Sequence, residues 1–180
     1  MIKSKANIPM LRTLAATVQE IPGDVVEFGV YQGGSAAELC RLFPGRQVHL
    51  FDSCQGLPPK RGPKDGDHPG SFAATCEKIQ EAVDSYDNWT LHVGWFADSL
   101  RTIGNIDLLC FAHIDCDYEQ SYRDCVPWVL QRLAVGGVVV FDDYGCANCR
   151  GATGYLDRLL GGEIVKSSGH GAYYRKVADA

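Results

Sequence analysis

The sequence is short of several features that would assign it to a familiar class. Its 180 residues contain no apolar stretch of the roughly 18 residues that cross a membrane, so no membrane partner is expected. Lys and Arg number 17 against 22 Asp and Glu, and the formal net charge of −5 argues against a nucleic-acid or anionic-membrane surface. No apolar signal core follows the basic start Met1–Lys5, which favours a cytoplasmic protein.

Cysteine is abundant, but the repeated spacing of a zinc site is missing. Among the eight cysteines only Cys146 and Cys149 form a CxxC, and no second pair stands at a matching distance. We therefore do not expect structural zinc. Ordinary thiols are expected at Cys40, Cys76, Cys110 and Cys125.

Strands and helices are expected to alternate along almost the whole chain. The content of 46% hydrophobic and 22% charged residues is typical of a folded protein, and the length suits a single domain, 1–180. Strands are expected at Asp24–Val30, Gln47–Phe51, Trp89–Val93, Asp107–Asp115 and, after a turn at Val135–Gly137, Val138–Asp142; helices are expected at Ile8–Val18, Ser35–Phe43, Phe72–Val83, Tyr118–Leu133 and Ala152–Leu160. Residues 1–23 would form an N-terminal helical segment, and residues 53–70, rich in Pro, Gly and charge, a mobile loop.

This alternation predicts an α/β fold, with a mostly parallel sheet and helices on both faces. A final hairpin of Glu163–Lys166 and Ala172–Lys176 would add an antiparallel terminal strand.

Two acidic clusters follow hydrophobic runs that are expected to be buried strands. Leu108–Ile114 leads into Asp115-Cys116-Asp117, and Val138–Phe141 leads into Asp142-Asp143. Ligands of parallel α/β sheets bind at the carboxyl ends of the strands, which share one edge, so these carboxylates are expected to lie close together. Carboxylates grouped in this way repel one another unless a cation lies between them. A hard divalent cation with oxygen ligands is the expected cation, and the site would be that of an enzyme.

A glycine-rich turn between a strand and a helix indicates a nucleotide-type cofactor. Glu27–Ser35 contains this turn, which lacks both the GxGxxG pattern and the lysine of a phosphate-binding loop. Asp52 ends the next strand, where a carboxylate can accept hydrogen bonds from ribose hydroxyls; the alternative is that it caps a helix or a turn. NAD and S-adenosylmethionine both fit these two features. Glu27 favours S-adenosylmethionine, because its carboxylate would attract a sulfonium and an ammonium and would repel a pyrophosphate.

Several segments, in order, resemble the macrocin O-methyltransferase family. They are VEFGVYQGGSA (Val26–Ala36), FDSCQGLP (Phe51–Pro58), GWFADSL (Gly94–Leu100), HIDCDYEQS (His113–Ser121) and FDDYGCANCRGAT (Phe141–Thr153). The resemblance implies a Rossmann-like class I methyltransferase fold. It also implies metal-dependent methyl transfer from S-adenosylmethionine to a sugar or phenolic hydroxyl of a small molecule in natural-product biosynthesis.

The resemblance further implies roles for individual residues. Asp117 would be the general base, and Mg²⁺ would be held by Asp115, Asp142 and Asp143. The cofactor would be lined by Glu27, Gly29, Ser35, Asp52, Ser53, Trp95, Phe96, Asp98 and Asp115.

Other interpretations stay open. Asp142-Asp143 and Asp117 could cap the helices that follow them, and Trp95 and Phe96 could be core residues. His113 is expected to be a core or supporting residue rather than a ligand. For the whole chain, the alternatives are an NAD-linked oxidoreductase and a non-catalytic binding protein for S-adenosylmethionine, and a homodimer could cover the site.

Overall fold

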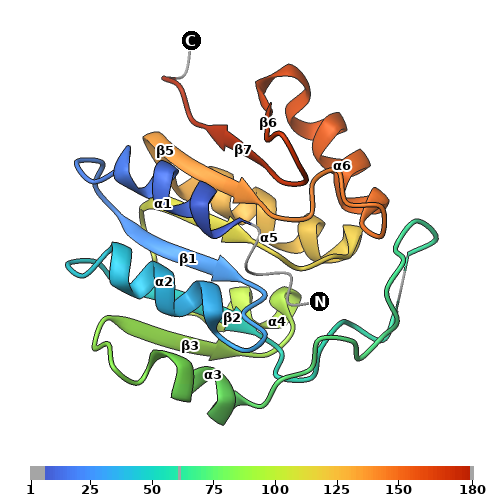
Figure 1. Cartoon of the computed structure of the whole chain (residues 1–180), viewed down its shortest axis with the longest axis horizontal. Coiled ribbons are helices and arrows are strands. Elements are labelled where there is room, and N and C mark those ends of the chain that lie inside the picture. The colour runs from blue at the N-terminus through green and yellow to red at the C-terminus, as the bar shows by residue number, and fades with distance from the viewer. Residues whose placement is uncertain (1–6, 61, 179–180) are drawn as a thin grey trace.

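A central sheet of seven strands organises the molecule (Figure 1). The computed structural model describes residues 7–60 and 62–178, so Met1–Lys5 and Arg61 lie outside the described residues. The strands are β1 (Asp24–Phe28), β2 (Val48–Asp52), β3 (Trp89–Val93), β4 (Leu109–Ile114), β5 (Leu133–Phe141), β6 (Val165–Lys166) and β7 (Ala172–Arg175), in the order β3-β2-β1-β4-β5-β7-β6. Strands β1 to β5 run parallel, whereas β7 pairs antiparallel with both β5 and β6. The predicted mostly parallel sheet with an antiparallel terminal strand is therefore confirmed.

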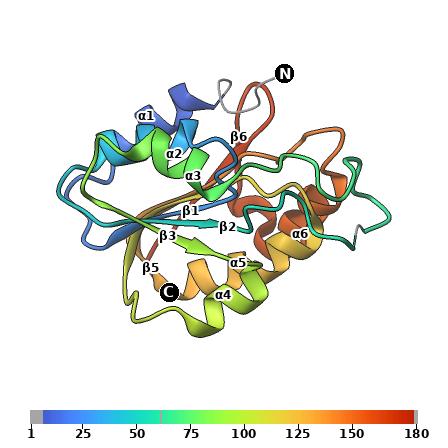
Figure 2. The same cartoon turned by 90° about the horizontal axis from the view of Figure 1, so that it is seen from below.

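Helices cover both faces of this sheet. They are α1 (Ile8–Ala16), α2 (Gly34–Leu42), α3 (Cys76–Val83), α4 (Phe96–Thr102), α5 (Glu119–Arg132) and α6 (Arg150–Leu160). Figure 2 shows α1, α2 and α3 on one face and α4, α5 and α6 on the other. None of these described helices has the length and apolar character needed to span a bilayer.

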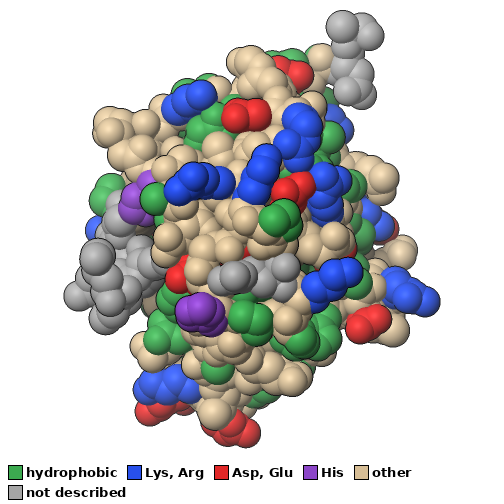
Figure 3. Space-filling model, turned by 90° about the vertical axis from the view of Figure 1, so that its right-hand side faces the viewer, with side chains coloured by type: hydrophobic (Ala, Val, Ile, Leu, Met, Phe, Trp, Pro, Cys, Tyr) green, Lys and Arg blue, Asp and Glu red, His purple; other side chains and the backbone are tan. Residues whose placement is uncertain are grey.

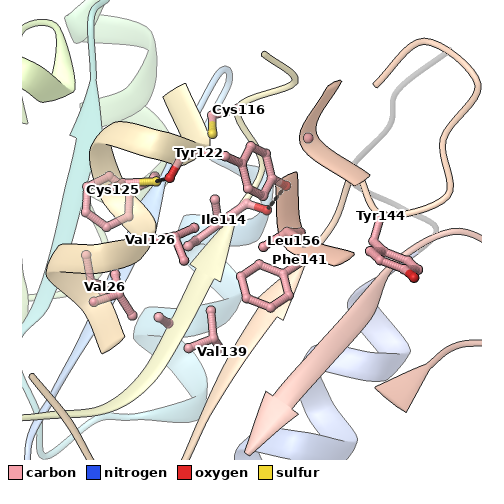
Figure 4. Close-up of a cluster of buried hydrophobic side chains, with 14 of the residues drawn as sticks. Val26, Ile114, Cys116, Tyr122, Cys125, Val126, Val139, Phe141, Tyr144 and Leu156 are labelled. Carbon is pink, nitrogen blue, oxygen red and sulfur yellow. Dashed lines mark hydrogen bonds between the residues drawn. The ribbon is translucent and has the colours of Figure 1, made fainter. Parts of the chain in front are cut away.

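The central strands are hydrophobic on both sides because both sides are covered. On the α1–α3 face, Leu11, Leu39 and Ile79 pack against β1 and β2. On the other face, Tyr122 of α5 and Leu156 of α6 belong to a buried cluster with residues of β4 and β5 (Figure 4). Each such side chain contributes about 1.5–3 kcal/mol of transfer free energy, so the two cores fix the strand ends from both sides.

Three elements differ from the expected pattern. The turn expected at residues 135–137 lies inside β5, because Gly136 adopts φ +84° and the register with β4 shifts there without ending the pairing. Helix α3 begins at Cys76 rather than Phe72, because Thr75 caps it by accepting a hydrogen bond from the Lys78 backbone N–H. Helix α4 was not predicted, and its seven residues include none that is fully buried, so they show no apolar periodicity.

The long loop between β2 and α3 is fastened at its two ends. Cys54 and Cys76 form a disulfide with their Cα atoms 5.5 Å apart, so the expectation of an ordinary thiol at Cys76 is wrong. The two cysteines stand 22 residues apart, and only the fold brings them together. Mobility of the intervening loop stays a prediction.

Candidate active site

A cavity of about 960 Å³ opens at the carboxyl ends of the parallel strands. It lies where β1 and β4 are neighbours and the strand order reverses, which is the usual ligand position in such sheets. Its walls come from the β1–α2 turn, the start of the long loop, the β3–α4 connection, the β4–α5 connection and the first turns of α5. The long loop projects from this end of the molecule (Figure 1). The cavity is large enough for a cofactor together with a second small molecule.

The glycine turn is built for close approach of the backbone. Gly29 has φ +84°, and a Cβ atom there would lie 1.8 Å from the carbonyl oxygen of Asp115. The turn is held by Asp52, whose Oδ2 accepts hydrogen bonds from the backbone N–H groups of Val30 (2.8 Å) and Tyr31 (3.0 Å). Its Oδ1 accepts a third from Cys54 N–H (2.8 Å). Asp52 therefore ties the glycine turn to the long loop, besides facing the cavity.

Most of the predicted cofactor residues are brought together on the cavity wall. The wall includes Gly29, Ser35, Asp52, Ser53, Trp95, Phe96 and Asp115. The structure does not bring Glu27 and Asp98 to this wall. Glu27 is fully buried behind it, because alternation along β1 points its side chain beneath the turn. Asp98 lies in the first turn of α4 with its side chain exposed.

The acidic strand ends do meet. Carboxylate oxygens of Asp115, Asp117 and Asp143 lie within 4.8 Å of one another, and so do ligand atoms of His113, Asp115 and Asp142. Burial, followed by the charges of Asp142 and Asp143, holds the pKa of Asp115 well above its ordinary value. The carboxylate oxygens of Asp115, Asp117 and Asp143 form a set of donors that fits a hard divalent cation.

Asp143 is buried, and its carboxylate holds the turn that follows β4. Its Oδ2 accepts hydrogen bonds from the backbone N–H groups of Cys116 (3.1 Å) and Asp117 (2.7 Å) and from the Tyr122 hydroxyl (3.1 Å). These bonds stabilise the turn after β4, where Asp117 adopts a left-handed φ of +59°. The Sγ atom of Cys149 lies 3.4 Å from the other oxygen of Asp143 and 3.5 Å from Asp117 Oδ1.

A buried polar chain runs beneath the site. His113 Nδ1 donates to Glu27 Oε1 at 2.8 Å, and its Nε2 faces Asp142 Oδ1 at 3.5 Å. Asn7 Nδ2, at the start of α1, donates to the same oxygen of Asp142. Burial alone would lower the pKa of His113, but the carboxylates of Asp142 and Glu27 outweigh it and hold this pKa well above its ordinary value. As expected, His113 lies in the buried core.

The long loop covers the acidic cluster from above. Asp65 is buried and accepts hydrogen bonds from the backbone N–H groups of Gly62 (2.9 Å) and Glu119 (3.2 Å). The Tyr118 hydroxyl donates to the carbonyl of Asp67 at 2.9 Å. Only the tertiary structure places this segment, because nothing local in a sequence shows where a loop without periodicity will dock.

Several wall residues were not predicted from the sequence. Gln120, Ser121 and Asp124 face the cavity from one side of α5, and their helical spacing directly after Asp117 is a signal that could have found them. Tyr31 of the glycine turn also lines the cavity, as do Leu57, Lys60 and Phe72, whose place is decided by the path of the long loop.

The order of the strands in the sheet is that of a class I methyltransferase. The glycine turn after β1 and the carboxylates after β4 and β5 agree with this class. The model of the macrocin-O-methyltransferase (TylF) family matches residues 3–176, and the chain belongs to that family. It is thus an S-adenosylmethionine-dependent O-methyltransferase, which confirms the predicted family, fold and enzyme class.

Individual relatives agree with this assignment. A Streptomyces olivaceus 4′-O-methyltransferase for a rhamnosyl-bearing tetracenomycin C is 29% identical over 177 residues, covering 88% of this chain and 67% of the relative. The mycinamicin III 3″-O-methyltransferase of Micromonospora griseorubida is 30% identical over 182 residues, covering 88% and 70%. The structure of the O-methyltransferase NovP superposes with a TM-score of 0.80 at 25% identity, covering 95% of this chain and 79% of that one.

Proposed function

We propose that this chain catalyses Mg²⁺-dependent methyl transfer from S-adenosylmethionine to a hydroxyl of a small natural product, a sugar hydroxyl first and a phenolic one second. The observation that carries the proposal is that Asp115 and Asp117 lie on the cavity wall together with the glycine turn, and that their carboxylate oxygens lie within 4.8 Å of one of Asp143. One site can then hold the methyl donor and the acceptor oxygen together.

The cofactor fits the residues present. Oε2 of Glu27 is buried and has no hydrogen-bond partner among the described residues, which suits an ammonium group nearby. Gly29 lets the Asp115 backbone lie against the glycine turn, because a Cβ atom there would meet the Asp115 carbonyl oxygen at 1.8 Å, and Asp52 on the wall can accept hydrogen bonds from ribose hydroxyls with its remaining lone pairs. Trp95 and Phe96 offer aromatic surface for the adenine. A pyrophosphate would meet Asp52 and Asp115 on the wall without a compensating lysine in the turn, which disfavours the NAD-linked alternative.

The cation fits as well. Asp115, Asp142 and Asp143 would hold Mg²⁺, which prefers carboxylate oxygens and keeps positions for water or substrate. When bound, the ion supplies Lewis-acid chemistry that lowers the pKa of an acceptor hydroxyl. The observation of this structure that supports the cation is the gathering of carboxylate oxygens of Asp115, Asp117 and Asp143 within 4.8 Å of one another.

The protein's own groups would then do three things. Asp117, held by the Asp143 bonds to its turn, takes the proton of the acceptor hydroxyl. When bound, S-adenosylmethionine would supply the methyl group, whose bond to sulfur would break as its bond to the acceptor oxygen forms, with sulfur released as a neutral thioether. The walls from the long loop and α5 exclude water and align the two reactants, which supplies much of the acceleration.

A small, hydroxylated acceptor suits the surface around the opening. Among the described residues, Figure 3 shows basic and acidic side chains interleaved on this end of the molecule rather than a field of one sign. By their names, the Streptomyces olivaceus relative acts on a rhamnosyl-bearing tetracenomycin C and the Micromonospora griseorubida relative on mycinamicin III. A homodimer that completes the cover of the cavity is a further proposal, which light scattering would test.

Formation of S-adenosylhomocysteine tests the proposal directly. The protein would be incubated with S-adenosylmethionine and a panel of glycosides, diols and catechols, with Mg²⁺, with EDTA, and with EDTA followed by excess Mg²⁺. We expect product with Mg²⁺, none with EDTA, and recovery on adding Mg²⁺ back. Undiminished turnover in EDTA would rule out the metal mechanism, and a nicotinamide absorbance change with NAD would favour the oxidoreductase.

A further inference from the structure

His113 occupies a position that the proposed chemistry does not use. Its side chain is 2% exposed, and it lies between Glu27 and Asp142, which are 0% and 2% exposed. Glu27 and His113 are paired residues of the adjacent strands β1 and β4. Asp142 directly follows the next strand, β5, whose Val140 pairs with His113. The sheet itself therefore fixes the order carboxylate, imidazole, carboxylate.

The two ring nitrogens face two different parts of the site. Nδ1 donates to Glu27 Oε1 at 2.8 Å, which leaves Glu27 Oε2 as the oxygen without a partner among the described residues. Nε2 faces Asp142 Oδ1 at 3.5 Å and has no closer acceptor within that part of the chain. Hydrogen bonds of this kind are often long in a ligand-free site and shorten once the site is filled.

We infer that His113 is a positioning residue that sets the cofactor-side carboxylate of Glu27 through Nδ1 and the metal-side carboxylate of Asp142 through Nε2. This inference rests on the proposed function, because it assigns Glu27 to the cofactor side and Asp142 to the cation. One nitrogen of the buried ring thus serves the cofactor side, and the other nitrogen serves the cation side. If the histidine only filled the core, substitutions that remove one donor or the other would affect both ligands equally.

Two amide substitutions separate the two tasks. Asparagine places its amide nitrogen near the position of Nδ1, so His113→Asn keeps a donor for Glu27 and loses the donor for Asp142. Glutamine reaches the position of Nε2, so His113→Gln keeps the donor for Asp142 and loses that for Glu27. Both variants remove the same ring, so they disturb the core to a similar extent and control for each other.

The readouts are binding measurements on the whole chain. Mn²⁺ binding is followed by electron paramagnetic resonance, and S-adenosylhomocysteine binding by calorimetry without metal. Loss of a group that orients a metal ligand typically weakens metal binding 10–100-fold, so we expect His113→Asn to weaken Mn²⁺ binding by about tenfold or more and cofactor binding by less than about threefold. His113→Gln should show the reverse pattern, with a loss of about tenfold on the cofactor side.

Asn7→Ala provides a further control. Asn7 donates to the same oxygen of Asp142 but has no recorded bond to Glu27, so this variant should weaken Mn²⁺ binding alone. Equal losses of both ligands in the two His113 variants, or no loss in either, would overturn the inference. Failure of both variants to fold, seen by circular dichroism melting, would also overturn it, because the ring would then be a structural core residue.

The wild-type chain separates this inference from the proposed function. A wild type that binds neither S-adenosylhomocysteine nor Mn²⁺ refutes the proposed function itself. A wild type that binds both, together with variants that do not diverge, refutes only the role of His113.

Discussion

Replacing Asp117 by asparagine should separate proton removal from metal binding. Asparagine is among the few residues that tolerate a left-handed backbone, so the φ of +59° at this position is kept and the turn should fold as before. The substitution keeps the size of the side chain and removes its basicity. Mn²⁺ should still bind through Asp115, Asp142 and Asp143 with an affinity within about threefold of the wild type.

Asp117→Asn is expected to lower the turnover number. General-base catalysis contributes about 10²–10⁴-fold, which corresponds to about 2.7–5.4 kcal/mol of activation free energy, so kcat should fall by that factor. The assay is S-adenosylhomocysteine formation at saturating acceptor and Mg²⁺, alongside Mn²⁺ binding by electron paramagnetic resonance.

Asp124→Asn is the matched control. Asp124 lies on the same cavity wall, where its carboxylate accepts a hydrogen bond from Gln120 Nε2 at 2.8 Å, but it is not one of the clustered ligand groups. We expect its kcat to stay within about threefold of the wild type. The reasoning fails if Asp117→Asn retains more than about a tenth of the turnover. It also fails if Asp117→Asn lowers Mn²⁺ affinity as much as Asp142→Ala does, because Asp117 would then be a metal ligand.

Three further perturbations test the site and its frame. Because the folded pKa of Asp115 is raised, its contribution to stability is present at low pH and is lost as the pH rises through that value. The Tm of the metal-free wild type should therefore fall relative to that of Asp115→Asn as the pH rises. Added Mg²⁺ should reduce this fall. A parallel pH dependence of the two proteins would contradict this. Replacing Cys54 by serine removes the disulfide to Cys76, 22 residues away, and should lower the free energy of unfolding in urea by about 3 kcal/mol. Free thiols at Cys54 and Cys76 in the wild type, seen by thiol titration, would contradict this. Tyr122→Phe removes a donor from Asp143 and should cost about 1–2 kcal/mol in the same unfolding assay, and an unchanged midpoint would show that this bond contributes little.

Local sequence patterns predict much of the fold. Strand β3 begins and ends where the pattern places it, because Trp89–Val93 is bounded by polar residues and a glycine. The other parallel strands are correct to within a few residues, since each is a hydrophobic run that stops at a charge or a glycine. Helix α4 was not predicted, because a partly buried helix of seven residues has no apolar stripe. The first part of β5 was not predicted, because Val135–Gly137 is typical of a turn that precedes a strand, whereas the strand runs through Gly136.

The sequence by itself determined which carboxylates would meet, because parallel strands joined by helices bring their carboxyl ends to one edge, and Asp115 and Asp142 directly follow two neighbouring strands. It also determined the enzyme class through the motifs at those ends. Only the tertiary structure decided how each oxygen is used. Asp143 turns one oxygen toward three donors of the β4–α5 turn, and Glu27 points beneath the wall to His113 rather than into the cavity. These choices depend on side-chain directions and contacts between distant segments, which a pattern along one chain does not contain.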